Sequence, residues 1–541
     1  MTITAIELEY FKGVSDRVRI DLKPITLLVG ANSAGKSSVF HALMYLRNIL
    51  VDGNPFARKL GLFPDHDLGG FRNLVHQHDT SKAVVLRIDI DRGLVRGHPS
   101  WPYVQGYADA ENHEVEEQFD SRMRLTHEIE NEIRSVWVEV TVAWEEATSG
   151  SRPRVIAYSV GINDELVGVI ERPDAKKAAY ISRLNFMHEV FQPTGHEEWL
   201  RSWGGPPTPE TGTTRNEFEE QLREMISTDP TSDGTQRVQL RIGGSPDGSA
   251  VPGRVALRPH FKKGTYEPKF YDMMVGMLSQ ALVGPLELAY EELKNMRYLG
   301  PLRAIPPRDF GYEVFEKESD WANGLAGWSE LINDYQRNGN ECEVVGSYLG
   351  EYDIRVRRIR ELDRDSVKHI LDSETTITSE QLKELCSAID EKSPARWKIE
   401  LVDKRSGTAI EPRDVGVGVS QLLPVIVATR RAGFFCVEQP ELHLHPKMQV
   451  ELGQIFLEGW WGHQVESQFL IETHSEHLIN RLTHRVREKK VDQNDIAVIF
   501  VGSRNGSVRF DRLRIDGDGD FIDDWPGGFF EESFREHFAG R

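Results

Sequence analysis

The hydrophobic pattern is most regular at the two ends of the chain. Short apolar runs rich in β-branched residues predict strands there, and apolar residues at helical spacing predict helices between them. The predicted strands cover residues 3–10, 25–29, 81–90, 397–402, 434–438 and 468–471. The predicted helices cover residues 38–46, 271–296, 379–389 and 476–482.

The pattern weakens in the middle of the chain, from about residue 91. Residues 108–133 are dominated by Glu, Asp and Asn, which is typical of a solvated helix or excursion. Strand-like segments follow at 136–144, 154–161 and 166–171 and predict a meander, whereas residues 202–252 are rich in Gly, Pro, Ser and Thr and predict loop. We interpret residues 91–265 as an insertion whose role the sequence does not explain.

Composition favours a soluble globular protein of two or three folding units. The 541 residues are 39% hydrophobic and 28% charged, and no apolar run approaches the roughly 18 residues of a membrane helix. The three cysteines are far apart, and the chain starts with strand-like sequence, so we expect a cytoplasmic protein without disulfides or a zinc ribbon. The net charge of −20 argues against a general nucleic-acid coat, although it leaves room for a local basic groove.

One stretch carries a specific chemical prediction. Residues 30–38, GANSAGKSS, fit the phosphate-binding pattern GxxxxGK[ST] and lie between a predicted strand and a predicted helix. The backbone N–H groups of such a loop and the positive helix end bind phosphate oxygens. The expected contacts are Asn32, Ser33, Ala34, Gly35, Lys36, Ser37 and Ser38, with Lys36 on the β- and γ-phosphates and Ser37 on Mg²⁺. The sequence therefore predicts a nucleoside triphosphate site.

A second group of motifs lies near the C-terminus. The apolar run 434–438 ends in Glu438, and an acid at such a strand end, far downstream of a P-loop, holds Mg²⁺ in Walker B strands. The run 468–471 leads to His474, which at a neighbouring strand tip can reach a γ-phosphate. Gly416 and Gly418 open a predicted helix and so form a second potential anion site.

Together these motifs resemble ABC-type ATPase heads of the SMC-like and RecF-like kind. The stretches EQPELHLHP (438–446) and ETHSEHLINR (472–481) are most similar to AAA-family ATPases of the overcoming-lysogenization-defect class and to their relatives in bacterial anti-phage systems. The resemblance covers about residues 1–90 and 396–541, together with the segment YLGPLR (298–303). It implies an α/β fold in which an ABC-ATPase head is assembled from the N- and C-terminal segments around a large α+β insertion.

The resemblance also implies roles for single residues. Gly416 and Gly418 match the signature glycines, His474 matches the switch histidine, residues 444–446 fill the D-loop position, and Gln77 is a candidate Q-loop glutamine and metal ligand. In such heads the signature of one protomer closes over ATP bound to the other. The resemblance therefore implies ATP and Mg²⁺ as cofactors, a homodimer or higher homo-oligomer joined through the nucleotide faces, and a separate effector protein, a nuclease or toxin.

Two positions depart from the family pattern. Val417 occupies the signature serine position, so a hydroxyl there would have to come from Ser420. Gln439 occupies the position of the catalytic glutamate, and a neutral amide orients water but is no general base. Glu441 is the alternative carboxylate, with His474 the next candidate. We expect slow basal ATP hydrolysis, roughly below one turnover per second.

Other clusters have ordinary explanations that we weigh against functional ones. The histidines at 443, 445, 463, 474 and 477 lack the spacing of a transition-metal site. The acidic run 516–524 is more typical of a solvated turn than of a Mg²⁺ nuclease centre. The arginines at 355–360, and those at 297, 303 and 308, suit ion-paired faces better than phosphate-binding or contact surfaces.

The expected domains are the N-terminal half of the head (1–90), the insertion (91–265), a helical segment (266–395) and the C-terminal half of the head (396–541). The leading hypothesis is an ATPase that controls an effector in anti-phage defence. Two alternatives stay open: a RecF-like DNA-repair ATPase that clamps DNA, which makes nucleic acid a possible partner, and a scaffold in which bound ATP is not hydrolysed.

Overall fold

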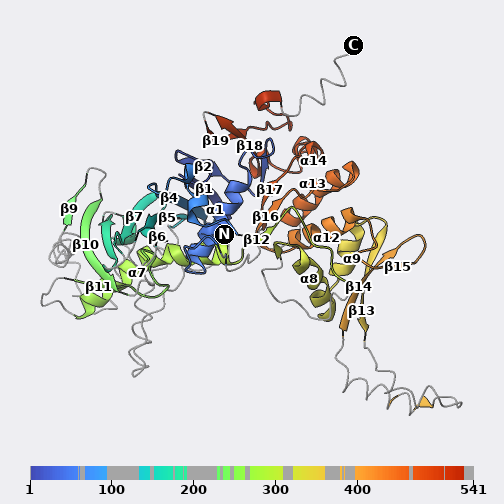
Figure 1. Ribbon diagram of the computed structural model, residues 1–541, viewed down its shortest axis with the longest axis horizontal. Coiled ribbons are helices and arrows are strands. Elements are labelled where there is room, and N and C mark those ends of the chain that lie inside the picture. Colours follow the sequence, from blue (N-terminus) through green and yellow to red (C-terminus); the bar gives the residue numbers. More distant parts are fainter. Residues whose placement is uncertain are drawn as a thin grey trace, which may run out of the picture. The chain divides into compact units, whose positions relative to one another are not determined.

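Figure 1 shows the computed structural model, in which the chain divides into two compact units. The first unit comprises Met1–Met296, Asn494–Arg514 and Phe521–Arg541, and the second comprises Arg297–Gln493 and Ile515–Asp520. The structure describes residues 2–58, 60, 67–93, 133–146, 151–174, 177–186, 188–191, 228–231, 235–243, 249–261, 268–308, 321–359, 378–379, 383, 396–461, 467–504 and 506–528.

The first unit is built on a large antiparallel sheet. Its described strands run in the order β11-β10-β8-β7-β6-β5-β4-β1-β2, with β9 paired to β10. Their bounds are β1 Thr2–Glu9, β2 Val18–Asp21, β4 Val84–Asp91, β5 Ser135–Glu145, β6 Arg152–Ile162, β7 Glu165–Glu171, β8 Tyr180–Leu184, β9 Thr228–Pro230, β10 Gln236–Gly243 and β11 Arg258–His260.

Helix α7 (Pro268–Lys294) covers one face of this sheet and also contacts α1 (Ser37–Leu50). The Tyr158 hydroxyl on β6 donates to the Leu282 carbonyl of α7 over 2.9 Å. The neighbouring strand residues on this face, such as Val138 and Val140, are apolar and fully buried. Burial of apolar surface therefore holds the helix against the sheet.

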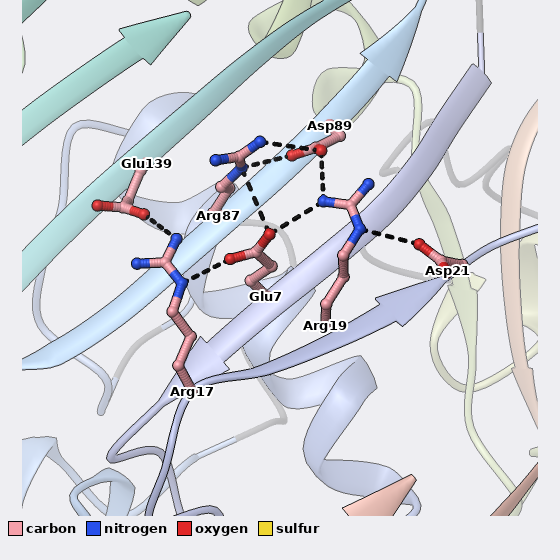
Figure 2. A network of polar contacts seen from close by, with 7 residues as sticks. All are labelled: Glu7, Arg17, Arg19, Asp21, Arg87, Asp89 and Glu139. Carbon is pink, nitrogen blue, oxygen red and sulfur yellow. Dashed lines mark hydrogen bonds and ion pairs between the residues drawn. The ribbon is translucent and has the colours of Figure 1, made fainter. Parts of the chain in front are cut away.

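Alternating charges cross the other face of β2, β1, β4 and β5 (Figure 2). The strand register aligns Arg19, Glu7, Arg87 and Glu139 in one row, so each side chain has an opposite charge beside it. Arg19 pairs with Glu7 over 2.9 Å and with Asp89 over 2.6 Å. Such pairs add little stability singly, but a network fixes register, because a one-residue slip would bring charged residues to the buried face.

A smaller group of strands in the first unit leads to the predicted P-loop. Strand β3 (Ile25–Val29) pairs in parallel with β18 (Ile496–Arg504), which pairs antiparallel with β19 (Ser507–Leu513). Two short helices precede β4 in the chain: α2 (Phe71–Leu74) and the 3₁₀ helix η1 (His76–His78). A 3₁₀ turn, η2 (Glu189–Phe191), follows β8.

The second unit contains three parallel strands, in the order β12 (Arg297–Leu299), β16 (Gly433–Glu438) and β17 (Ser467–Glu472). Helices α12 (Val417–Thr429), α13 (Pro446–Trp461) and α14 (Glu476–Arg487) pack in sequence beside them. Helices α8 (Leu325–Gln336) and α9 (Glu341–Tyr348) join α12 to a three-stranded sheet, β13 (Tyr352–Ile359), β14 (Arg396–Asp403) and β15 (Ala409–Ile410). The 3₁₀ turn η5 (Gln493–Asp495) lies where the chain passes from the second unit to the first, and η6 (Pro526–Gly528) belongs to the first unit.

The α/β class expected from the sequence is confirmed, but the units differ from the expected domains. The meander within the expected insertion 91–265 extends the sheet that β1 and β2 begin, because β5 pairs along its length with β4. Strands β18 and β19, expected in the C-terminal half, belong to the first unit because β18 pairs with β3. The predicted helix 379–389 lies almost wholly outside the described residues. No helix among the described residues is long and apolar enough to cross a membrane.

Candidate nucleotide-binding site

The predicted phosphate loop begins where β3 leaves its sheet. All five residues of β3 are buried, and Gly30 follows with a φ of 143°. A Cβ atom at Gly30 would lie 2.2 Å from the Val501 carbonyl oxygen on β18, which no other residue type could accommodate. Close strand packing therefore requires the first glycine of the motif.

The second glycine of the loop meets a side chain from β19. Gly35 has a φ of 103°, and a Cβ atom there would lie 2.8 Å from the Val508 Cγ2 methyl. The same methyl would lie 2.5 Å from a Cβ atom at Gly13, whose carbonyl accepts the Val508 N–H over 2.9 Å. Val508 thus packs between the loop and the turn at residues 11–13, and it holds both backbones in place.

The open side of the loop is exposed and its lysine is buried. Asn32 and Ser33 are exposed, and Ser33 has a φ of 61°, which turns the backbone there. Lys36 is 3% exposed, and its Nζ donates to the carbonyl oxygens of Gly30 over 3.1 Å and Ala31 over 2.9 Å. The ammonium group is therefore held against the loop backbone, close to the N–H groups expected to bind phosphate.

Helix α1 starts directly after the loop with no negative charge of its own. Its first turn contains no acidic residue, and no side chain caps its N-terminus. Ser37 is its first residue and is half-buried, whereas Ser38 is buried and donates its N–H to the Gly35 carbonyl over 3.0 Å. A helix N-terminus without an acid favours an external anion, so these residues fit a phosphate group.

The turn that contains Lys12 contacts the helix that follows this loop. Lys12 contacts His41 of α1, with 2.5 Å between Nζ and Nδ1, and its carbonyl lies 2.9 Å from Nδ1 of His76. Gln77 comes next in the chain, is exposed and has a φ of 54°. Its role as the Q-loop glutamine stays a prediction.

The predicted acidic half of the site lies in the second unit, at the ends of β16 and β17. Glu438 is 7% exposed, and its Oε1 accepts the Tyr298 hydroxyl over 2.8 Å. Gln439 leaves the strand with a φ of 44° and donates its N–H to the Glu472 carbonyl over 2.8 Å. The buried carboxylate of Glu438 fits the charge and the oxygen chemistry that Mg²⁺ requires.

Glu441 and His474 are brought together at the same strand ends. Oε1 of Glu441 accepts the His474 backbone N–H over 2.6 Å, which ties the loop after β16 to the tip of β17. Glu441 is 9% exposed, and burial raises the pKa of its carboxyl. A raised pKa makes a carboxylate a stronger base, so Glu441 suits the role that Gln439 cannot perform.

The start of α12 corrects one expectation. Gly416 and Val417 are exposed, and a Cβ atom at Gly418 would lie 3.0 Å from the His443 carbonyl oxygen in the D-loop region. Ser420, by contrast, is fully buried and donates its hydroxyl to the Pro412 carbonyl over 3.0 Å. The Ser420 hydroxyl is thus used inside the unit and cannot replace a signature serine on the surface.

Sequence reasoning missed how the segment YLGPLR contributes to this half. Arg303 is 4% exposed, so it is no contact surface, and it donates to the carbonyls of Glu438 and Gln439. Burial lowers the pKa of its guanidinium to about 10. The segment was visible as part of the family resemblance, but no local pattern connects it with residues more than a hundred positions away.

The other charged clusters are ion-paired. Asp518 pairs with Lys489 over 3.1 Å and Asp520 with Arg487 over 2.5 Å, as suits a solvated turn. Among the described residues, no three His, Cys, Asp or Glu side chains form a group that could hold a metal ion. Arg357 lies 3.4 Å from Glu400, and Arg360 is outside the described residues.

Two family models match the chain, and both describe ATPase domains of the AAA class. "AAA ATPase domain" matches residues 1–147, which contain the P-loop. "AAA domain, putative AbiEii toxin, Type IV TA system" matches residues 316–480, which contain the strand ends at Glu438 and Glu472. Together with the P-loop, these matches support ATP binding and a general ATPase function.

Three solved structures that align with the chain are SMC heads. They include the SmcHead bound to the C-winged helix domain of ScpA (11% identity, 95% of this chain, 98% of that chain, TM-score 0.37). Another is the Smc head domain with an extended coiled coil bound to the C-terminal domain of ScpA derived from Pyrococcus furiosus (13% identity, 95% of this chain, 96% of that chain, TM-score 0.36). A third is the SMC head domain from Thermotoga maritima (8% identity, 95% of this chain, 100% of that chain, TM-score 0.33). These TM-scores are low, so the ATPase assignment depends on the family models and the P-loop. No curated protein matches the sequence.

Proposed function

We propose that the chain is a slow ATPase that dimerises on ATP and controls a separate effector protein in anti-phage defence. The observation that carries the proposal is the P-loop. Its two packed glycines fix the backbone, its lysine lies against that backbone, and its helix starts without an acid. These features create a preformed site for an anion of high charge density.

Magnesium would be held by Ser37 and Glu438, with Gln77 as a third candidate. A hydroxyl, a carboxylate and an amide oxygen are all hard ligands of the kind that Mg²⁺ prefers. When bound, Mg²⁺ neutralises charge that develops on the β- and γ-phosphates. The proposal assigns phosphate binding to the P-loop and metal binding to the end of β16.

Slow turnover follows from the residues after β16. Gln439 can orient a water molecule through its amide, but it cannot accept a proton. Glu441 can accept one, and its raised pKa increases its basicity. However, its Oε1 is already engaged by the His474 N–H, and the side chain is buried. We therefore expect turnover roughly below one per second, against common values near ten.

Dimerisation is proposed from the start of α12. Val417 is 43% exposed, although it is apolar, and it lies beside Gly416 at a helix N-terminus. An exposed apolar residue next to a potential anion site suits a surface that closes over a nucleotide held by a second copy. Gly416 and Gly418 remain in this proposed composite site, and Ser420 is left out.

The effector role rests on the resemblance of residues 438–446 and 472–481 to ATPases of bacterial anti-phage systems. The family model over residues 316–480 itself carries the description of a putative toxin of a type IV system, so a toxic activity of this chain is an outcome that the test must distinguish. Bound ATP would keep the assembly in one state, and hydrolysis or loss of ATP would release the effector. Expression of the intact operon should therefore give a complex of this chain with a second protein, and addition of ATP or ADP should change its composition.

Phosphate release by the purified chain is the direct test of the ATPase. We expect slow, Mg²⁺-dependent release by the wild type and background release by Lys36→Ala. Tight ATP binding without release above background would favour the scaffold instead. DNA binding that weakens with salt and requires ATP would favour the DNA-repair clamp.

A further inference from the structure

The strand β16 is held at both ends by arginines from one short segment. Arg297 donates from Nη1 to the Ala432 carbonyl over 2.7 Å and from Nη2 to the Arg431 carbonyl over 2.6 Å, just before the strand starts. Arg303 donates from Nη2 to the carbonyls of Glu438 over 2.8 Å and Gln439 over 3.2 Å, where the strand ends. Burial lowers the pKa of both guanidinium groups to about 10.

The second arginine is also connected to another element of the candidate site. The Arg303 backbone N–H donates to Oε1 of Gln421 over 3.3 Å, and the Gln421 Nε2 donates back to the Arg303 carbonyl over 2.8 Å. Gln421 is buried in α12, about one turn from the exposed helix start. A chain of hydrogen bonds therefore leads from α12 through Arg303 to the backbone of Gln439.

The same segment also orients the Glu438 carboxylate. Tyr298 on β12 is 2% exposed and donates its hydroxyl to Oε1 of Glu438. Burial and the negative charge of Glu438 raise the pKa of Tyr298, so the hydroxyl keeps its proton and remains a donor. A neutral phenol fixes the carboxylate without cancelling its charge, whereas an arginine at this place would compete with a metal ion for it.

From these contacts we infer that residues 298–303 position the acidic half of the site. Tyr298 orients the Glu438 carboxylate, which would hold Mg²⁺. Arg303 holds the left-handed backbone of Gln439 and links it to the helix whose start is the proposed dimer surface. Both are positioning residues that act through Glu438 and Gln439, and the inference rests on the proposed ATPase function. Closure of a second copy on α12 would then set the geometry for hydrolysis.

Burial of the Arg303 guanidinium costs desolvation free energy, and the hydrogen bonds that offset this cost fix the backbone at the end of β16. Its desolvation disfavours folding, and the Arg303 guanidinium offsets that cost with hydrogen bonds to the backbone carbonyls of Gln421, Glu438 and Gln439. The Arg303 Nε has no hydrogen-bond partner in the described part of the chain. An apolar side chain here would leave these three carbonyls without that donor, so the guanidinium is the group that fixes the backbone of Glu438 and Gln439.

The tyrosine is tested by the Mg²⁺ concentration that gives half of the increase in ATP affinity over the affinity in EDTA. Tyr298→Phe removes one hydrogen bond to a charged group, so this concentration should rise about tenfold while ATP affinity in EDTA stays unchanged. Tyr348→Phe is the matched control, because Tyr348 also donates its hydroxyl to a glutamate, Glu458, elsewhere in the second unit. An equal shift in both variants, or none in Tyr298→Phe, would overturn the role of Tyr298.

The arginine is tested by comparison with its counterpart at the other strand end. Lysine cannot donate to two carbonyls in the fixed geometry of a guanidinium. Arg303→Lys should lower kcat about tenfold, the effect of one lost hydrogen bond at the site, with KM unchanged. Arg297→Lys should lower the melting temperature similarly with kcat unchanged. If Arg303→Lys does not fold, Gln421→Met breaks the link to α12 alone and should lower kcat in the same way.

Two kinds of failure are distinguishable in this experiment. A wild-type chain without Mg²⁺-dependent phosphate release would contradict the proposed function and the inference with it. A wild-type chain that hydrolyses ATP, with equal kcat values for the Arg297 and Arg303 variants or an unaffected Gln421→Met variant, would overturn the inference alone.

Discussion

The two halves of the candidate site are built on different principles. The P-loop half uses backbone N–H groups, and its side-chain requirements are local: two glycines that fit against Val501 and Val508, and one lysine. The acidic half uses buried side chains, which are held by partners from distant parts of the sequence, such as Tyr298 for Glu438. The first half should therefore fail when a backbone is blocked, and the second when a hydrogen bond is lost.

The largest expected effect is on the backbone of the first half. Gly30→Ala would place a Cβ atom 2.2 Å from the Val501 carbonyl oxygen, so β3 and β18 would have to separate. We expect a loss of about 3 kcal/mol or more in the free energy of unfolding, measured by chemical denaturation.

The control for this collision is Gly53→Ala. Gly53 also has a positive φ, 65°, but a Cβ atom there would meet no atom of the described residues within 4 Å. Its substitution should cost about 1 kcal/mol, the cost of the left-handed backbone alone. Equal losses in the two variants would mean that strand packing does not determine the first glycine of the P-loop.

In the acidic half, the largest expected effect belongs to Glu441. Glu441→Gln should reduce turnover about 100-fold, because it removes a general base, with ATP affinity unchanged. The wild-type rate should fall as the pH drops through the raised pKa of Glu441, since only the ionised form accepts a proton. That limb of the pH profile should disappear in the variant.

The Glu441→Gln substitution should raise the stability of the fold, although it lowers turnover. Its folded pKa is raised above the unfolded value, so the ionised side chain destabilises the fold above that pKa, and the penalty disappears as the pH falls through it. Glu441→Gln should therefore be more stable than the wild type at neutral pH. A variant that is less stable, with an unchanged pH profile, would point to Gln439 or His474 instead, and Gln439→Glu should then raise turnover.

A smaller effect is expected at the proposed dimer surface. A Cβ atom at Gly416 would meet no atom of the described residues within 4 Å, unlike one at Gly418, and the backbone φ of −52° suits any residue. Gly416→Trp should lower hydrolysis about tenfold by blocking closure, with ATP binding retained. Gln336→Trp, at an exposed helix position, is the control. Unchanged hydrolysis and ATP-dependent dimerisation in Gly416→Trp would exclude this surface.

The smallest effect concerns Ser420. Its hydroxyl bonds to the Pro412 carbonyl in a fully buried position, so Ser420→Ala should cost about 1 kcal/mol of stability and leave turnover unchanged. Thermal unfolding and phosphate release, measured on the same variant, would separate an effect on stability from an effect on turnover. Loss of turnover at unchanged stability would restore Ser420 to the composite site.

The comparison also explains what could be predicted from the sequence. The P-loop could be predicted because Gly30, Gly35 and Lys36 act through neighbouring backbone, so their spacing in the sequence defines the geometry of the loop. Strands β3, β16 and β17 could be predicted because each is short and contains a run of apolar residues. The contribution of Tyr298 and Arg303 could not be predicted, because it depends on the pairing of β12 with β16, which are more than a hundred residues apart in the sequence.

Expectations about exposure failed for a similar reason. Ser420 and Arg303 are polar, and a sequence pattern assigns polar residues to the surface. Both are buried because each finds a backbone carbonyl to bond with, Pro412 for the serine and Glu438 for the arginine. Buried polar groups of this kind depend on tertiary partners that periodicity cannot reveal.

ATP binding with and without Mg²⁺ tests the central claim most directly, that one half of the site holds phosphate and the other holds metal. Titration of the wild-type chain with a fluorescent ATP analogue should show binding in EDTA that strengthens in Mg²⁺. Lys36→Ala should lose binding in both conditions, whereas Glu438→Gln should keep the EDTA affinity and lose only the increase with Mg²⁺. Full wild-type affinity in Lys36→Ala, or an unchanged response to Mg²⁺ in Glu438→Gln, would contradict the claim.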